Sequence, residues 1–201
     1  GHEPPAVIDS FVECAYTMRE WVGPKVELAF DFHGKMTPAL AVEICHEIKG
    51  MRPMFVEEPV PQENIDALKE VSSKVPFPIA TGERFTSMWE FEMLLRRDAV
   101  QYVRPDVCMV GGISGAKKVA TLAEAHHAGV VPHNPLSPVS TAACLQIAAC
   151  IPNFALQEYP LGEQEPPKSD IVAGAQVHDG EGFLPLPERP GIGVELQPRA
   201  A

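Results

Sequence analysis

Short apolar runs rich in β-formers alternate with longer amphipathic segments from residue 5 to about residue 160. This alternation is typical of parallel α/β proteins. It predicts six strands, at 26–32, 54–57, 78–81, 100–104, 129–132 and 153–157. It predicts helices near 6–21 and at 38–49, 63–74, 87–96, 114–127 and 139–150, with start signals at Thr37-Pro38 and Ser114.

The pattern favours a (β/α) TIM-type barrel, because functional-looking residues end nearly every predicted strand. A closed barrel has eight strands in about 250 residues, so six strands make up only its C-terminal part. We expect the first strands to come from the rest of the polypeptide or from another chain, since an open six-stranded sheet would leave its edges exposed. The competing fold is a doubly wound open sheet, but no glycine-rich phosphate loop follows the first strand.

After residue 160 the alternation of short apolar runs and amphipathic segments ends. Segments such as PLGEQEPPKSD and GFLPLPERPGIGVELQPRAA are rich in proline and glycine and contain only short apolar pieces. We therefore divide the chain into a partial barrel domain at 1–160, holding strands three to eight, and a C-terminal extension at 161–201.

The composition of the chain limits the kinds of partner that it can bind and the cellular compartment in which we expect it. Of the 201 residues 45% are hydrophobic, which supports a substantial core, and the net charge of −11 argues against binding nucleic acid or an anionic membrane. No apolar run approaches the roughly 18 residues of a membrane span. Five cysteines without CxxC spacing predict buried thiols in a reducing compartment, so we expect a cytoplasmic protein.

Three carboxylates, each closing an apolar run, recur at equal intervals. Asp31 and Glu57 are 26 residues apart, and Glu83 follows after 26 more, which is about the length of one βα unit. Successive parallel strands deliver their C-terminal residues to one rim. Clustered acids need a neutralising cation, and carboxylate oxygens suit Mg²⁺, so the spacing predicts a catalytic metal site.

Glu58 stands beside Glu57, and strand side chains alternate between the two faces, so only one of the pair can face the barrel axis. Glu57 keeps the interval, and Glu58 is expected to be a supporting residue.

Two histidines lie at strand ends. His33 falls two residues beyond Asp31 and shares its face if the strand continues. His133 follows GVVP, and Asp106 ends the preceding strand, within hydrogen-bond reach of His133. A carboxylate there would fix the imidazole tautomer and raise its basicity, which predicts a general-base pair, although Asp106 could simply cap the following turn.

Glu158, at the end of NFALQ, has two possible roles. If protonated it could hydrogen-bond developing negative charge, and otherwise it could pair with a base. Arg84 could neutralise acids or bind a carboxylate. Gly111-Gly112 is interpreted as a turn, since no phosphate-binding pattern surrounds it.

Six ordered motifs together resemble the enolase superfamily in its mandelate racemase branch, and within it sugar-acid dehydratases of the galactonate type. The motifs are DFHGK at 31–35, FVEEPV at 55–60, IATGER at 79–84, RPDVCMVGGIS at 104–114, PHNPLSP at 132–138 and LQEYP at 156–160. The closing PGIGVEL is also similar to that family's tail. The resemblance covers residue 5 to the end.

The resemblance implies that Asp31, Glu57 and Glu83 bind Mg²⁺, which holds a substrate carboxylate. It further implies that His133, paired with Asp106, removes the proton α to that carboxylate. His33 would then be the acid that helps the β-hydroxyl leave, and Glu158 would hydrogen-bond the enediolate. Such an α-proton is too weakly acidic for imidazole unless cation and hydrogen bonds stabilise the intermediate.

The resemblance also implies an N-terminal capping domain toward which residues 161–201 pack, and homo-oligomeric assembly. Our hypothesis is Mg²⁺-dependent dehydration of a small-molecule sugar acid, a galactonate-like aldonate, to a 2-keto-3-deoxy acid. Alternatives are a racemase, epimerase or cycloisomerase of the same superfamily, or a non-catalytic remnant lacking its cap.

Overall fold

A computed structural model describes residues 5–198, which form two compact units. The first comprises the described part of Gly1–Thr81 together with Met93–Tyr102, and the second comprises Gly82–Glu92 together with the described part of Val103–Ala201.

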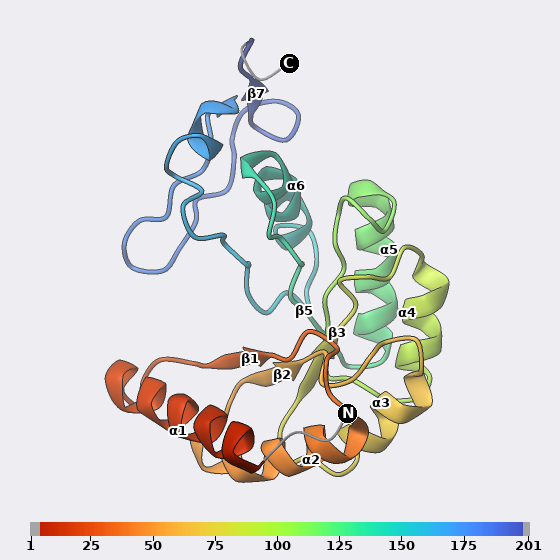
Figure 1. Ribbon diagram of the computed structural model, residues 1–201. Helices are drawn as coiled ribbons and strands as arrows, with labels where there is room; N and C mark the ends of the chain where they lie inside the picture. Colours follow the sequence, from red (N-terminus) through yellow and green to blue (C-terminus); the bar gives the residue numbers. More distant parts are fainter. Residues whose placement is uncertain (1–4, 199–201) are drawn as a thin grey trace. The chain divides into compact units, whose positions relative to one another are not determined.

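A parallel sheet forms the centre of the first unit (Figure 1). Its strands are β1 (Ala29–Asp31), β2 (Phe55–Glu57) and β3 (Ile79–Thr81). Asp31 is the register partner of Glu57, and Glu57 of Ala80. The strands are shorter than the sequence predicts, but all three lie within the predicted ranges and end close to the expected acids.

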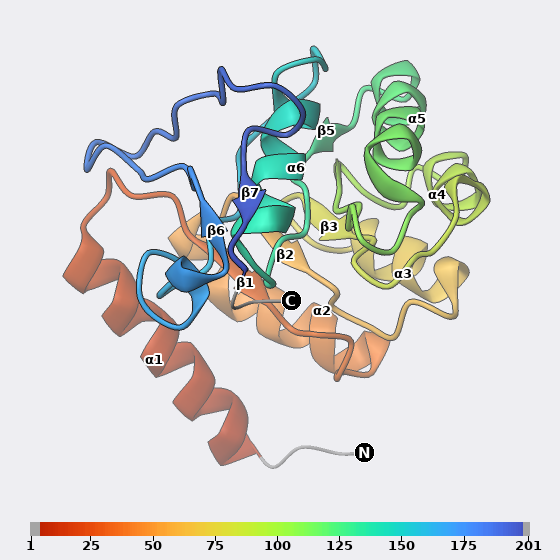
Figure 2. The same ribbon diagram turned by 90° about the horizontal axis from the view of Figure 1, so that it is seen from above.

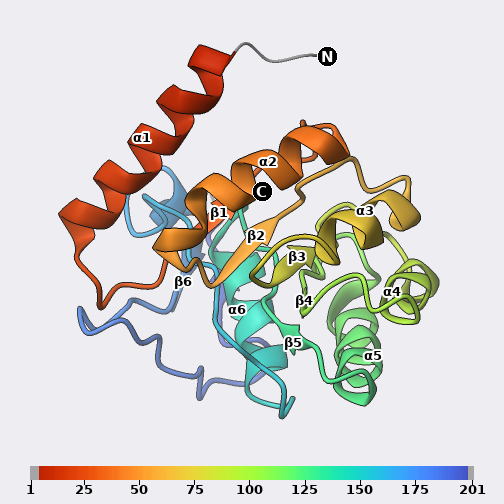
Figure 3. The same ribbon diagram turned by 90° about the horizontal axis from the view of Figure 1, so that it is seen from below.

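The helices of the first unit lie on one face of these strands (Figure 3). They are α1 (Pro5–Val22), α2 (Pro38–Glu47), the 3₁₀ turn η1 (Ile48–Met51) and α3 (Ile65–Ser72). Phe11 of α1 packs edge-on against Phe30 and Phe32, at centroid distances of 6.1 and 5.6 Å. Thr37 caps α2 with Pro38 in its first turn, so this predicted helix start is confirmed.

Parallel pairing continues in the second unit. The strand β4 (Tyr102–Val103) begins in the first unit, and Val103 accepts a hydrogen bond from Val131, next to β5 (Gly129–Val130). Where the sequence predicts a strand at 153–157, the structure has a single parallel bridge between Val130 and Phe154. That prediction was wrong in length, because the chain keeps the backbone bonds of only Asn153 and Ala155 to Val130.

Helices and a tail complete the second unit. The helix α4 (Met88–Leu95) runs from the second unit into the first, while α5 (Gly112–Ala125) and α6 (Pro138–Ala148) lie side by side (Figure 1). The tail holds a 3₁₀ turn, η2 (Lys168–Asp170), and an antiparallel pair, β6 (Val172–Ala173) with β7 (Glu195–Leu196), seen in Figure 2. Packing of this tail toward a capping domain stays a prediction.

The start of α5 corrects the sequence analysis. The helix begins at Gly112, two residues before the predicted start at Ser114, and Gly111 caps it with φ of 95°. Both Gly111 and Gly112 have positive φ, a conformation that side chains disfavour, so the glycine pair forms the expected turn and also sets the helix start.

The cysteines also differ from expectation. Cys45 and Cys144 are buried, and burial raises the pKa of each thiol to about 12. Cys14, Cys108 and Cys150 are exposed, because apolar sequence neighbours do not fix which way a side chain points. Within residues 5–198, no helix is long and apolar enough to cross a bilayer.

Candidate active site

Two of the predicted metal ligands, Asp31 and Glu57, lie at the carboxyl ends of adjacent strands. They are register partners in the parallel pair β1–β2, so their backbones stand side by side. The Asp31 side chain is about half exposed, whereas Glu57 is buried. The first unit therefore brings together two of the three acids that the spacing predicted.

His33 lies beside Asp31, as predicted, but the two residues do not share the face of one continued strand. The strand β1 ends at Asp31, and His33 has φ of 52°, so no extended strand carries both residues. Instead the His33 N–H donates to Asp31 Oδ1 at 2.7 Å, and His33 Nδ1 lies 3.5 Å from Asp31 Oδ2. The two side chains are neighbours because of a local turn of the Asx type.

Glu58 lies outside the strand, so strand alternation does not set the direction of its side chain. The strand β2 ends at Glu57, and Glu58 adopts φ of 39°, so its side chain no longer follows the strand's two-face rule. Glu58 is buried, and Thr81 Oγ1 donates to its Oε1 at 3.4 Å. This contact agrees with the supporting role expected of Glu58, but the positive φ of Glu58 and not strand alternation separates it from Glu57.

In the second unit, Gly82 turns the chain to present Glu83. Gly82 has φ of 133°, and a Cβ there would collide with the Phe91 ring, so this position requires glycine. Glu83 is buried, and its Oε1 lies 3.4 Å from the Nε of Arg84, which fits the neutralising role predicted for that arginine.

Asp106 and His133 form the predicted pair. Asp106 Oδ2 lies 2.8 Å from His133 Nδ1, and the two residues form a parallel β-bridge. Asp106 also accepts the Cys108 N–H on Oδ1 at 2.7 Å, so it caps the turn as well as holding the imidazole. The other ring nitrogen, Nε2, lies 3.4 Å from Glu83 Oε2. One side of His133 is therefore fixed while the other faces a predicted metal ligand.

The charges around this pair shift both pKa values. Burial alone would lower the pKa of His133, but the hydrogen bond to Asp106 and the negative charges of Glu158 and Glu83 outweigh burial and raise it. Burial alone would raise the pKa of Asp106, but the hydrogen bonds with His133 and Cys108 outweigh it and lower that pKa. Asp106 thus stays an acceptor, and His133 becomes a stronger base.

Arg104 is a site residue that the sequence analysis missed. It is buried, and its Nη2 donates to Glu158 Oε2 at 2.7 Å. The same oxygen accepts the Asn134 N–H at 2.7 Å, so Glu158 pairs with a base, the second of its two predicted roles. The signal was available: Arg104 precedes Asp106 by two residues, and residues i and i+2 of a strand share a face.

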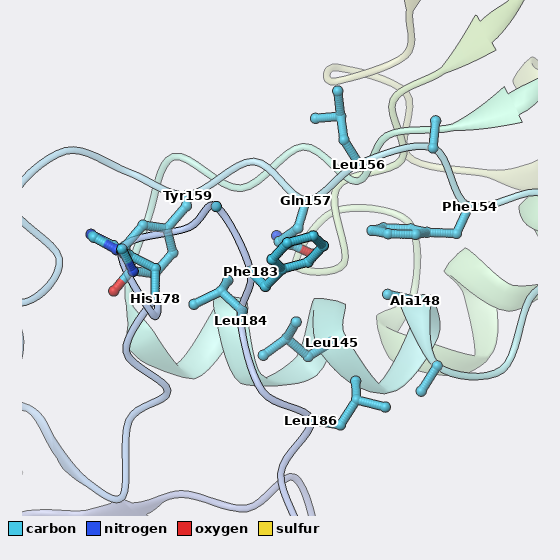
Figure 4. A pocket seen from close by; sticks show the side chains of 14 residues that line it. Leu145, Ala148, Phe154, Leu156, Gln157, Tyr159, His178, Phe183, Leu184 and Leu186 are labelled. Atoms are coloured by element: carbon cyan, nitrogen blue, oxygen red, sulfur yellow. The ribbon is translucent and has the colours of Figure 1, made fainter.

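A cavity of about 670 Å³ in the second unit lies apart from these groups (Figure 4). It is bounded by α6, the segment around Phe154–Tyr159 and the tail around Phe183, and its described lining residues include no Asp, Glu, Lys or Arg. Gln157 and Tyr159 line it whereas Glu158, between them, does not. The chemistry of Glu158 therefore lies away from this apolar cavity.

The three predicted ligands have the chemistry of a magnesium donor set. Asp31, Glu57 and Glu83 offer only oxygen atoms, the donors that Mg²⁺ prefers, and two of them start from adjacent register positions. No thiol stands at these strand ends to favour a softer metal. The residues fit magnesium.

Comparison with known proteins places the chain in a family. The sequence model of the "Enolase C-terminal domain-like" family matches residues 3–200, and the chain belongs to that family. The chain is thus a C-terminal portion of a (β/α) barrel, which decides against the doubly wound sheet.

Individual relatives agree with this assignment. The chain is 34% identical over 193 residues to D-galactonate dehydratase of Verminephrobacter eiseniae, covering 94% of this chain and 50% of the relative. A mandelate racemase/muconate lactonizing enzyme from Jannaschia sp. CCS1 has a TM-score of 0.92 at 33% identity, covering 100% of this chain and 51% of that one. An enolase from Agrobacterium radiobacter with bound Na and L-malate has a TM-score of 0.91 at 33% identity, covering 100% and 54%. The chain spans about half the length of these proteins.

Proposed function

We propose that this chain carries the catalytic rim of a Mg²⁺-dependent sugar-acid dehydratase that converts a galactonate-like aldonate to a 2-keto-3-deoxy acid. The observation that carries the proposal is the Asp106–His133 pair, whose second ring nitrogen, Nε2, lies 3.4 Å from Glu83 Oε2. A fixed imidazole beside a predicted metal ligand is the arrangement that abstraction of a proton α to a carboxylate needs.

His133 is the base in this proposal. Nδ1 is held by Asp106, so Nε2 accepts the α-proton of the substrate. Asp106 keeps the imidazole in one tautomer and stabilises the imidazolium that forms. The raised pKa of His133 favours the transfer, because the proton goes to a stronger base than ordinary imidazole.

Negative charge on the substrate would be stabilised from two sources. Asp31, Glu57 and Glu83 would hold Mg²⁺, which when bound supplies the positive charge that neutralises the substrate carboxylate as its α-proton leaves. The buried Arg104 forms an ion pair with the partly exposed Glu158 near His133, and the arginine would donate hydrogen bonds to the enediolate.

His33 would complete the elimination. Its side chain is about half exposed beside Asp31, so it can exchange protons with solvent and deliver one to the departing β-hydroxyl. The proton lost from the α-carbon goes to His133, and the hydroxyl leaves as water with the proton from His33. The enol product then becomes the 2-keto-3-deoxy acid.

The relatives support the substrate class. The Verminephrobacter protein is named for D-galactonate, and the Agrobacterium neighbour holds L-malate, another 2-hydroxy carboxylate. Both ligand types present a carboxylate with a hydroxyl on the α-carbon, which suits a rim of acids and a nearby base.

Incubation of the full-length protein with a set of aldonates tests the proposal. We expect 2-keto acid formation, scored with semicarbazide, with a galactonate-like member, and loss of the product on chelation of the metal. The set should include the galactonate epimers as matched controls. Failure of every aldonate to yield a 2-keto acid would contradict the dehydratase assignment.

Racemisation or epimerisation is the second candidate. It is favoured by the half-exposed position of His33, because Asp31 holds His33 less firmly than Asp106 holds His133. It needs the same α-proton abstraction but no departing hydroxyl. Deuterium incorporation at the α-carbon in D₂O without any 2-keto acid would favour it. Absence of both exchange and product would favour a non-catalytic remnant.

A further inference from the structure

Glu163 is a buried acid that the proposed chemistry leaves unused. It lies in the first turn beyond Tyr159, where its N–H donates to the Pro160 carbonyl at 3.2 Å. Only 3% of the residue is exposed, although the surrounding LGEQEPP segment is mostly exposed. A carboxyl is costly to bury, so its partners decide what it does there.

One oxygen of Glu163 begins a directional series of hydrogen bonds. Thr141 Oγ1, on α6, donates to Glu163 Oε2 at 2.7 Å. Asn134 Nδ2 in turn donates to Thr141 Oγ1 at 2.7 Å. A threonine hydroxyl has a single proton, so giving it to Glu163 leaves the oxygen lone pairs facing Asn134.

Asn134 connects this series to the candidate active site. It follows His133 in the chain and is fully buried. Its N–H donates to Glu158 Oε2 at 2.7 Å, and its Nδ2 donates to the Glu158 carbonyl at 3.0 Å. Ser140 Oγ donates to Asn134 Oδ1 at 2.5 Å, so both polar ends of the amide are engaged. The orientation of the Asn134 amide therefore fixes the position of the Glu158 backbone relative to Asn134, the residue next to His133.

We propose that Glu163 is a positioning residue for the active site: by accepting the Thr141 hydroxyl proton it orients Asn134, and Asn134 sets the placement of Glu158 and of the His133 loop. The effect on turnover rests on the proposed function. The effect on the orientation of Asn134 does not.

The chemistry of Glu163 fits an acceptor in an apolar setting. Burial raises the pKa of Glu163, opposed by the hydrogen bond from Thr141 and the charge of Lys168. Its Oε1 is buried and has no hydrogen-bond partner among the described residues, so it can carry the proton while Oε2 accepts. Without an acceptor at this position the Thr141 hydroxyl would be free to rotate. Its proton could then point toward the Asn134 Nδ2 group, and Thr141 would no longer accept the hydrogen bond from that group.

The turnover test compares variants of the full-length protein. We expect Glu163→Ala to lower kcat for α-proton exchange roughly 10-fold or more, with KM within about threefold, because small misplacements of catalytic groups cost rate rather than binding. Glu163→Gln keeps an acceptor oxygen and should recover kcat to within about threefold. Glu165→Ala, two residues along the same turn and exposed, is the matched control and should leave kcat unchanged.

A second pair of variants guards against misfolding. Thr141→Val removes the hydroxyl without changing the shape of the side chain and should reproduce the kcat loss, whereas Thr141→Ser should restore it. A kcat for both Glu163→Ala and Thr141→Val within about twofold of the Glu165→Ala value would refute a positioning role. A fall in melting temperature with kcat unchanged would likewise reduce Glu163 to a structural anchor of the tail.

Side-chain amide NMR of Asn134 reads the same contact without any turnover. We expect its two amide protons to be protected from exchange in the wild type and in Glu163→Gln, and to lose protection in Glu163→Ala and Thr141→Val. Unchanged amide signals would overturn the proposal. Should the wild type prove inactive on every aldonate, the proposed function fails while this measurement still decides the role of Glu163.

Discussion

Two aspartate–histidine pairs at the candidate active site, one in each unit, are built in opposite ways. Asp31 and His33 are two residues apart, their contact is 3.5 Å, and their side chains are 47% and 51% exposed. Asp106 and His133 are 27 residues apart, their contact is 2.8 Å, and their side chains are only 5% and 16% exposed. The first pair forms through a turn, and the second through a bridge between neighbouring parallel segments.

The difference teaches that burial and long-range pairing make a base, while residue type alone does not. In the second pair, the hydrogen bond to Asp106 and the negative charges of Glu158 and Glu83 raise the pKa of His133 against the effect of burial. The first pair is open to solvent, where Coulomb interactions are weakened by the high dielectric. We therefore propose that His133 abstracts the α-proton and that His33 delivers a proton to the departing hydroxyl.

The largest expected effect comes from replacing His133. His133→Asn should slow α-proton exchange by about 10²- to 10⁴-fold, the usual contribution of a positioned base. Exchange is measured by NMR in D₂O, with Mg²⁺-dependent stabilisation as the folding control. Unchanged exchange would show that the buried pair is not the base.

Replacing His33 should divide the reaction differently. His33→Asn should leave α-proton exchange within about threefold of the wild type but reduce 2-keto acid formation by about 10²-fold, the lower end of a general acid's contribution. The two rates are measured in the same D₂O incubation. Equal losses of both would mean that the exposed pair also takes part in proton abstraction, and the contrast between the pairs would disappear.

Magnesium should stabilise the protein through the predicted ligands. A ligand that binds only the folded state raises the melting temperature, and Glu57→Gln should abolish that rise. Glu58→Gln is the matched control, since Glu58 is equally buried but bonds to Thr81. A rise retained in Glu57→Gln and lost in Glu58→Gln would exchange the roles of the two acids.

The smallest expected effect is on stability in acid. The pKa of Asp106 is lowered in the folded state from an ordinary value of 3.8, so Asp106 stabilises the fold above that value and this contribution is lost as the pH falls through the lowered one. His133 is protonated in both states at such pH and adds no slope. Asp106→Asn should therefore flatten the fall of unfolding free energy below about pH 4, measured by urea titration. Asp66→Asn, an exposed acid, should leave the fall unchanged.

Much of the candidate site could be predicted from the sequence because it lies at strand ends. The positions of Asp31, Glu57 and Asp106 follow from short apolar runs that end in an acid, and parallel strands place such ends on one side. Local chemistry was equally readable at Thr37-Pro38, where the capping side chain and the fixed proline φ act within a single turn.

The remaining features depend on backbone dihedrals and distant partners. Glu58 and His33 leave the extended conformation at the positions where strand alternation was expected, because both adopt a positive φ, which is uncommon for residues other than glycine. The role of Arg104 depends on Glu158, 54 residues later, whose carboxylate lies beside it in the folded chain. The Glu163 series escaped for the same reason, since its members come from three separate segments.

By itself the sequence determined the alternation of strands and helices, the spacing of the three acids and the residue types available at each strand end, because these depend on local periodicity. Tertiary structure alone decided that His133 is the histidine held close against an aspartate. It also decided that Arg104 is the basic residue that pairs with Glu158, and that Glu163 is the acid buried at the start of the tail. Those outcomes depend on desolvation and on contacts between residues far apart in the chain, and both arise only when the chain packs.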